Sequence, residues 1–266
     1  MSALIVLTFL GPFVWQTTAI DFQISYQSPS ISHPFGTDDL GRDLLARVLW
    51  GGRVSISVGI VAVLIAITLG TLIGAAAGFF GGFIDSALMR FTDMAISLPV
   101  LPLLLLCSYL FRDSLTDRFG STLGPFVLIV GLIGLLSWMP TARLVRASFL
   151  SIKEKEFIEA AYSIGTSRSA IIFKHILPNA IGPVIVAATI GVGAAIITES
   201  SLSFLGLGFP PDTPTWGRLL FDGRNYMEIA SWFVIFPGAA IFLAVLSINY
   251  IGDGLRDAFD PRRTQS

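Results

Sequence analysis

Few side chains in this sequence could take part in catalysis or metal binding. Aspartate, glutamate, lysine and arginine together make up 13% of its 266 residues. Its two histidines, His33 and His175, stand far apart, which argues against a histidine-rich metal site. An enzyme working within the membrane would need paired aspartates or an HExxH motif in an apolar segment, and neither is present. We therefore predict no catalytic residue, no metal site and no cofactor bound by this chain.

The sequence also lacks the residues that bind the phosphates of a nucleotide. A phosphate-binding loop follows the pattern G-x-x-x-x-G-K-[ST], and this chain contains no Gly-Lys pair. Any ATP and Mg²⁺ that drive its work must therefore be used by another protein. The net charge of −1 gives no reason to expect nucleic acid as a partner. Cys107, the single cysteine, cannot form an intramolecular disulfide.

Glu199 is the ionisable residue with the clearest functional potential. It lies in the run TESSLSF, at the end of a long apolar segment. An ionisable group near a membrane is a candidate for gating or for lining a pathway. The alternative is an interfacial group that is hydrogen-bonded to a neighbouring helix end or loop. Asp93, at the edge of another apolar segment, is predicted to be interfacial.

The most informative segment is the charged island EFIEAAYSIGTSRSAIIFKHILPN at residues 156–179, which separates two apolar runs. Residues 152–164 combine helix-forming residues with an apolar set, and Gly165 can adopt a left-handed conformation that ends this helix. Thr166 or Ser167 can cap a second helix, which Pro178 ends before the next apolar run. We therefore expect two short helices with a turn at Gly165.

The side chains in this island suit contact with a partner better than a plain solvated connector. A connector would not need Phe157, Ala160 and Ala161, which are apolar or small, on an exposed helix. We therefore predict that residues 150–178 form a surface for a soluble protein.

The remainder of the chain supplies the membrane-spanning elements that would hold this surface. Hydrophobic residues make up 53% of the sequence, and the mean hydropathy is +0.77. These values predict an all-α, polytopic membrane helix bundle with about six transmembrane helices, as a single domain over residues 1–266. The predicted spans are 1–20, 54–84, 94–111, 119–142, 176–198 and 229–252. The strongly apolar part of the first run ends near Trp15, so we expect a short, tilted span or, preferably, a truncated or misassigned start.

Charge sets the predicted orientation. Basic residues outnumber acidic ones in the loop 141–178, and the tail 253–266 adds three arginines. The positive-inside rule places this loop and the tail in the cytoplasm, and an even number of spans places the N-terminus there too. The segments around 21–53, 112–118 and 202–228 are then expected to face outward.

Two further patterns concern helix packing. In the outward segment 37–50, Thr37 is a plausible N-cap, and an apolar stripe of Leu40, Leu44 and Val48 predicts a short amphipathic helix. This helix would either lie on the membrane surface or cap the bundle. In the second span, Gly70, Gly74 and Gly78 form a stripe of small residues that favours close approach of another helix.

The charged island resembles a known motif. Glu159-Ala160-Ala161, Gly165 and Leu177-Pro178 are spaced as in the EAA loop of permease subunits of bacterial ABC importers. His175 replaces the usual isoleucine two residues before Leu177, and HILPN is similar to the peptide and nickel branch. Segments 33–53, 198–220 and 252–262 resemble the same branch, most of all the C-type subunit of dipeptide and oligopeptide permeases. The chain departs from the family at its N-terminus, where a basic cytoplasmic tail usually precedes the first span.

This resemblance implies the type I ABC-importer permease fold and a place in the bacterial inner membrane. The partners it implies are a second homologous permease subunit, two cytoplasmic ATP-binding subunits and an extracytoplasmic binding protein. The EAA loop would dock in a groove on an ATPase, with Glu159, Ala160, Ala161 and Gly165 as the coupling core. Glu159 would either meet a cation of the ATPase or cap a helix. Trp216 and its loop would either contact the binding protein or form an interfacial aromatic anchor.

The substrate expected from the resemblance is a dipeptide or oligopeptide, with nickel or another small solute such as glutathione as the alternative. A stand-alone secondary transporter is a further alternative. Such a transporter would be expected to show ionisable residues or broken helices at mid-membrane, and the predicted spans show neither clearly.

Overall fold

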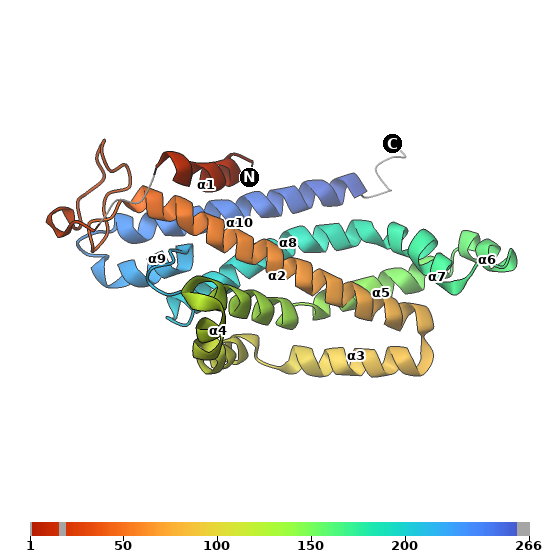
Figure 1. The fold of residues 1–266 in the computed structure, drawn as a ribbon. Helices are drawn as coiled ribbons and strands as arrows, with labels where there is room; N and C mark the ends of the chain where they lie inside the picture. The colour runs from red at the N-terminus through yellow and green to blue at the C-terminus, as the bar shows by residue number, and fades with distance from the viewer. Residues whose placement is uncertain (1, 16–19, 260–266) are drawn as a thin grey trace.

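The apolar runs fold as helices that lie along one long axis (Figure 1). The computed structural model describes residues 2–15 and 20–259. The longer helices are α1 (Ser2–Val14), α2 (Leu44–Phe80), α3 (Gly82–Ser97), α4 (Val100–Leu136), α5 (Met139–Lys153), α6 (Glu156–Ser163), α8 (Leu177–Phe204), α9 (Trp216–Gly223) and α10 (Trp232–Phe259). The short ones are η1 (Phe22–Ile24), α7 (Arg168–Ala170), the π-helical η2 (Ile171–Ile176) and η3 (Arg224–Tyr226). The prediction of an all-α bundle is confirmed.

Four of the described helices have the length and apolar composition needed to cross a membrane: α2, α4, the stretch Arg168–Phe204 that contains α8, and α10. The shorter helices α1, α3 and α5 run beside α2 along the same axis (Figure 1). The helix α4 contains a break at Gly120, where φ is 86°. The arrangement is therefore roughly consistent with the predicted six spans.

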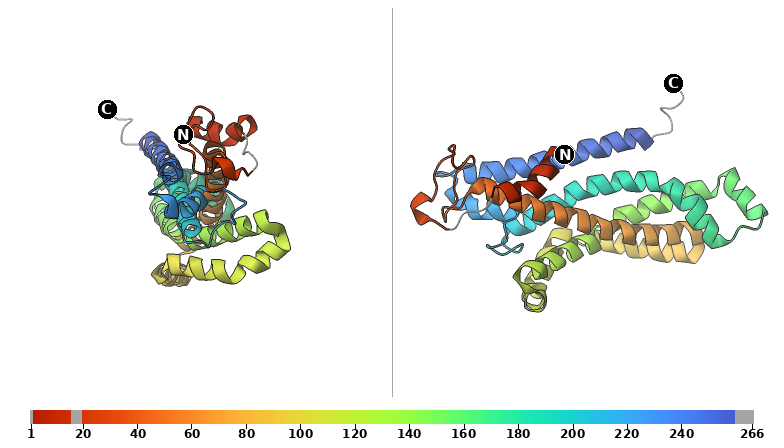
Figure 2. Two further views of the ribbon diagram at one scale, coloured as in Figure 1. Left: turned by 90° about the vertical axis from the view of Figure 1, so that its left-hand side faces the viewer. Right: turned by 45° about the horizontal axis from the view of Figure 1, so that its top comes forward.

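The third and fourth predicted spans, 94–111 and 119–142, are each divided between two helices. Leu98 precedes Pro99 and is extended, as residues before proline usually are, so α3 ends and α4 begins there. A second break at Ser137 and Trp138 separates α4 from α5, with Pro140 in the first turn of α5. The expectation that the spans contain no broken helix is therefore wrong. Figure 2 shows the first part of α4 projecting to one side of the bundle, while α3 runs beside α2.

The outward segment 37–50 differs from its prediction. Thr37 is not an N-cap. Helix α2 begins at Leu44, and the N-cap is Asp43, whose carboxylate accepts a hydrogen bond of 2.9 Å from the Ala46 N–H. Gly41 has a positive φ of 73° in a tight turn, which keeps the preceding residues out of the helix. Residues 44–50 are the first turns of the long helix α2, not a separate surface helix.

The two ends of the bundle have different contents (Figure 1). The α9 end holds α9, the loop 20–43 and the start of α2. The α6–α7 end holds the two short helices of the charged island and the far ends of α2 and α5. The C-terminal end of α10 lies toward the α6–α7 end (Figure 1). Buried apolar clusters lie at each end and in between.

Candidate functional site

The charged island folds as the short helix α6, a turn at Gly165, and α7, which continues through η2 into α8 without a gap. The prediction that Pro178 ends a second short helix is wrong, because Pro178 lies in the first turn of α8, where a missing N–H is tolerated. Gly165 has φ +82°, its N–H donates to the Tyr162 carbonyl at 3.0 Å, and the Thr166 N–H donates to the Ala161 carbonyl at 3.1 Å. These two bonds form a Schellman motif, the helix ending that usually places glycine in the left-handed position. Ser167 then caps α7, with its hydroxyl accepting from the Ala170 N–H at 3.4 Å. We call residues 156–176, from α6 through η2, the elbow.

The residues of the resemblance lie on different faces of the elbow. Glu159, Ala160 and Gly165 are exposed, whereas Ala161 is buried. Farther along, Leu177 is half-buried and Pro178 is exposed in the first turn of α8. The helix α6 begins after Lys155 without a side-chain cap. The alternative role of Glu159 as a helix cap is therefore not seen, and its carboxylate is left on the surface.

Large apolar side chains are exposed on the outer face of the elbow. Ile164 is 83% exposed and Phe173 is 65% exposed, and Phe157 and Tyr162 are exposed as well. Glu156, Glu159, Arg168 and Lys174 stand among them as exposed charges. A group of exposed apolar side chains with a polar rim is typical of a protein interaction surface.

The inner face of the elbow is anchored to the bundle. Ile158, Ile171 and Ile176 are fully buried in one cluster with Val145 and Phe149 of α5. The elbow is therefore attached to α5 through packed side chains. The π-helical turn η2, which the sequence analysis did not predict, joins α7 to α8 at this contact.

The helix α5 continues the connection into the bundle, since only Glu154 and Lys155 separate it from α6. The glycine stripe of α2 faces α5. A Cβ atom at Gly70 would lie 2.6 Å from the Thr141 Cβ, at Gly74 2.4 Å from the Ala142 carbonyl oxygen, and at Gly78 2.6 Å from the Phe149 Cβ. These distances are too short for any side chain, so α2 and α5 touch through their backbones.

Another side of α5 meets α3 through ion pairs. Arg146 binds both oxygens of Asp85, one of them at 2.6 Å from Nη2, and Arg143 pairs with Asp93. The sequence analysis placed Asp93 at the interface without a partner and counted the two arginines only as charge. The signal it missed is the pair of acidic residues on the helix that runs alongside α5.

Glu199 lies at the α9 end and is fully buried. Its carboxylate accepts hydrogen bonds from the Ser55 hydroxyl at 2.9 Å and the Ser203 hydroxyl at 2.8 Å. The Ser55 hydroxyl in turn accepts from the Trp216 N–H at 3.3 Å. Within the described residues no cation forms an ion pair with this carboxylate. Glu199 therefore links α2 and α8, and α9 through Ser55, by the hydrogen bonds that the alternative predicted, but it is buried in the bundle and not interfacial.

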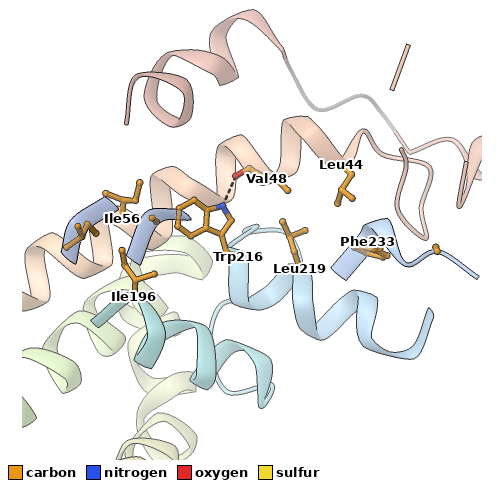
Figure 3. Packing of buried hydrophobic residues seen from close by; sticks show 10 residues of the cluster. Leu44, Val48, Ile56, Ile196, Trp216, Leu219 and Phe233 are labelled. Atoms are coloured by element: carbon orange, nitrogen blue, oxygen red, sulfur yellow. Dashed lines mark hydrogen bonds between the residues drawn. The ribbon is translucent and has the colours of Figure 1, made fainter. Parts of the chain in front are cut away.

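Trp216 is completely buried, so both predictions for this residue, a contact with a binding protein and an interfacial anchor, are wrong. Its indole N–H donates to the Val48 carbonyl at 2.9 Å, and its ring packs in a cluster with Leu44, Ile196 and Phe233 (Figure 3). The loop before α9 carries Thr215, which caps the helix and fixes the tryptophan at its start. Trp216 is therefore part of the core.

Buried charges complete the α9 end. Asp38 pairs with Arg47 at 2.6 Å and with Arg42 at 2.7 Å, and Arg47 also lies 3.6 Å from Asp222 of α9. Burial and, secondarily, the neighbouring Asp38 carboxylate raise the pKa of Asp39 above its usual value. This network fixes the loop 37–43 against α2 and α9.

Comparison with known proteins gives a consistent result. Residues 67–265 match the family described as "Binding-protein-dependent transport system inner membrane component". The chain is 42% identical to the dipeptide transport system permease protein DppC of Alkalihalophilus pseudofirmus over 236 residues, 89% of this chain and 74% of that protein. It is also 42% identical to the oligopeptide transport system permease protein OppC of Escherichia coli K12 over 253 residues, 95% of this chain and 80% of that protein.

Among solved structures, the fold is similar to a chain of the MetNI methionine ABC transporter in an inward-facing conformation. The TM-score is 0.60 at 20% identity, over 79% of this chain and 94% of that chain. An amino acid ABC transporter solved with histidines gives a TM-score of 0.57 at 17% identity, over 80% of this chain and 94% of that chain. At these identities the likeness concerns the fold.

Proposed function

The chain belongs to the family of inner membrane components of binding-protein-dependent transport systems, and from this premise we propose that it forms half of the translocation pathway of an ATP-driven peptide importer. It is a multi-pass permease subunit of the inner membrane. The peptide substrate is supported by relatives named for dipeptide and oligopeptide transport that share 42% of its residues.

The single observation that carries the mechanism is the elbow. Its outer face presents Ile164 and Phe173 to solvent, while its inner face packs Ile158 and Ile171 against α5. A helix pair that is exposed on one side and anchored on the other can transfer the movement of a bound partner to the bundle. Glu159, Ala160, Gly165 and Pro178 are proposed to form the exposed part of the coupling surface for an ATPase, with the buried Ala161 and the half-buried Leu177 supporting it from the inner side.

The proposed assembly contains this chain, a second homologous permease subunit as a heterodimer, two ATP-binding subunits and an extracytoplasmic binding protein. The ATPases bind and hydrolyse ATP with Mg²⁺, and this chain is a non-catalytic pore subunit that binds no nucleotide. ATP binding favours one arrangement of the ATPases, and differential contact with the elbow in the two arrangements shifts the bundle between its two openings. The α6–α7 end, the C-terminus and the N-terminus are proposed to lie in the cytoplasm, since basic residues outnumber acidic ones in the loop 141–178 and the tail carries three arginines.

Gly165 provides the test of this proposal. Valine at this position would have to adopt φ +82°, a left-handed conformation that β-branched residues rarely adopt, so α6 would end differently and the elbow would change its angle. We expect Gly165→Val to abolish peptide uptake by the assembled transporter, measured with labelled peptide in membrane vesicles that contain the binding protein and ATP.

The matched control is Gly165→Asn, because asparagine tolerates the left-handed conformation best among residues with a side chain. No atom lies within 4 Å of a Cβ placed at Gly165, so neither side chain meets a steric clash within the described residues. Uptake should survive Gly165→Asn. Normal uptake by a correctly assembled Gly165→Val transporter would refute the coupling role.

A further inference from the structure

The helix α3 follows α2 directly and packs beside it, and its other neighbour is α5. Thr92 is its only buried residue, and most of its other side chains, including Phe83 and Met94, are exposed. Its polar contacts to α5 are the Asp85–Arg146 and Asp93–Arg143 ion pairs, and Ala95 packs against the small cluster that contains Met139 and Ala142. Near the start of α5, the Phe91 ring also stacks on Trp138, with centroids 5.9 Å apart. We call this set of contacts the α3–α5 seam.

The ion pairs of the seam can be broken and remade without creating a cavity, unlike packed apolar contacts. Asp85 is 16% exposed and Arg146 is 35% exposed, and Asp93 and Arg143 are more than half exposed, so both pairs lie at the surface of the chain. The two-pronged bond between Arg146 and Asp85 has a defined direction, so it sets how α3 lies against α5 while the bond is made.

The backbone at both ends of α3 permits movement of the helix as a unit. Gly81 and Gly82 join α2 to α3 with positive φ values of 66° and 55°, and no atom lies within 4 Å of a Cβ placed at either. At its other end, α3 stops at the extended residue Leu98 before Pro99. Hinges consist of a few such residues at the ends of an element.

The seam also flanks a cavity. A space of about 670 Å³ lies between α2, α4, α5 and α8, and Ile96 of α3 and Thr141 of α5 are among its lining residues. Asp85, Arg143 and Arg146 lie farther along these two helices toward the elbow than Ile96 and Thr141. Separation of α3 from α5 would therefore widen the side of the cavity nearest the elbow.

We propose that Asp85 with Arg146 and Asp93 with Arg143 are positioning residues for transport, through which α5 holds α3 in place and releases it when the elbow moves. The backbone contact at Gly74 keeps α5 and α2 together as one body, so the ionic seam is the contact of α5 that opens. The inference rests on the proposed function, because the movement it describes is driven by an ATPase at the elbow.

The test uses the complete transporter in proteoliposomes with its binding protein, peptide and ATP. Asp85→Asn and Arg146→Gln each break the principal pair, and the double variant Asp85→Arg with Arg146→Asp restores it in reverse. We expect each single variant to lower the ratio of peptide imported to ATP hydrolysed roughly 5- to 10-fold, which is within the usual range of coupling energies. The reversed pair should recover most of the wild-type ratio.

Arg90→Gln on the same helix is the control, since Arg90 is exposed and forms no ion pair within the described residues. An unchanged import-to-hydrolysis ratio in Asp85→Asn, or a loss that only follows the amount of assembled transporter, would overturn the inference. So would a reversed pair no better than the single variants. Failure of the proposed function itself is distinguishable, because the wild-type transporter would then show no ATP-dependent import.

Discussion

At the α9 end of the bundle, charged and hydroxyl side chains are buried and bonded to one another, whereas at the α6–α7 end large apolar side chains are exposed. Glu199 and Arg47 are almost completely buried and both have partners within the chain. Ile164 and Phe173, by contrast, are exposed over most of their surface. The α9 end also has exposed apolar side chains, Phe22 and Ile31, so the contrast rests on its buried charges, which have no counterpart among the described residues of the elbow.

The difference indicates which end depends on a partner. Buried polar groups cost free energy unless they are bonded, and the α9 end supplies most of those bonds itself, although Arg47 Nη2 and the Ser200 hydroxyl form no hydrogen bond within the described residues. Exposed apolar groups gain free energy only when another surface covers them, and the elbow has such groups on its outer face. We infer that the α9 end is stable by itself and that the elbow is completed by another protein.

The largest expected effect on stability concerns the α9 end. Trp216→Ala removes the indole from the cluster around Leu44 and Phe233 and leaves a cavity, so we expect a loss of about 3–5 kcal/mol in the free energy of unfolding. Thermal unfolding of the purified protein in detergent measures it. Trp216→Phe is the matched control, since it keeps most of the ring volume but loses the hydrogen bond to Val48. We expect it to lower the free energy of unfolding by about 1 kcal/mol for the lost bond, plus a smaller amount for lost packing. An equally stable alanine variant would mean that this end is not the rigid one.

A smaller effect is expected at Glu199. Glu199→Ala leaves the hydroxyls of Ser55 and Ser203 buried without their acceptor, at an expected cost of about 1–3 kcal/mol. Glu199→Gln keeps the shape of the side chain and one of its two acceptor oxygens. It should therefore lower the free energy of unfolding by less than the alanine variant does. Parallel measurements of unfolding and of peptide uptake separate the two roles of this residue. A glutamine variant of normal stability that no longer transports peptide would support gating instead of structure.

The sequence predicted the elbow better than the α9 end because the two ends depend on different ranges of interaction. The turn at Gly165 and the cap at Ser167 are local features, formed by residues within a few positions of each other. The partners of Glu199 at Ser55 and of Trp216 at Val48 are separated from them by more than 140 residues. No pattern within one segment specifies such a pairing.

The same reasoning explains the corrected helix boundaries. Thr37 fits the composition of an N-cap, yet the turn at Gly41 and the ion pairs of Asp38 with Arg42 and Arg47 move the start of the helix to Leu44. Hydropathy alone merged the helices on either side of Pro99 and of Trp138, since both breaks lie within apolar runs. Pro99 is a local signal for the first break, because a residue before proline is usually extended.

The smallest expected effect on stability concerns the elbow, at the α6–α7 end. Ile164 is 83% exposed, so Ile164→Ser should change the free energy of unfolding by no more than about 0.5 kcal/mol. Its effect should instead appear in assembly, because the apolar side chain is proposed to be covered by the ATPase. We expect weaker retention of the ATPase on the purified permease complex, measured by the ratio of subunits after size-exclusion chromatography. Ile31→Ser, a fully exposed isoleucine in the loop 20–43 at the opposite end, is the control. If both variants retain the ATPase equally well, the exposed apolar face of the elbow is not the contact, and the contrast between the two ends loses its functional meaning.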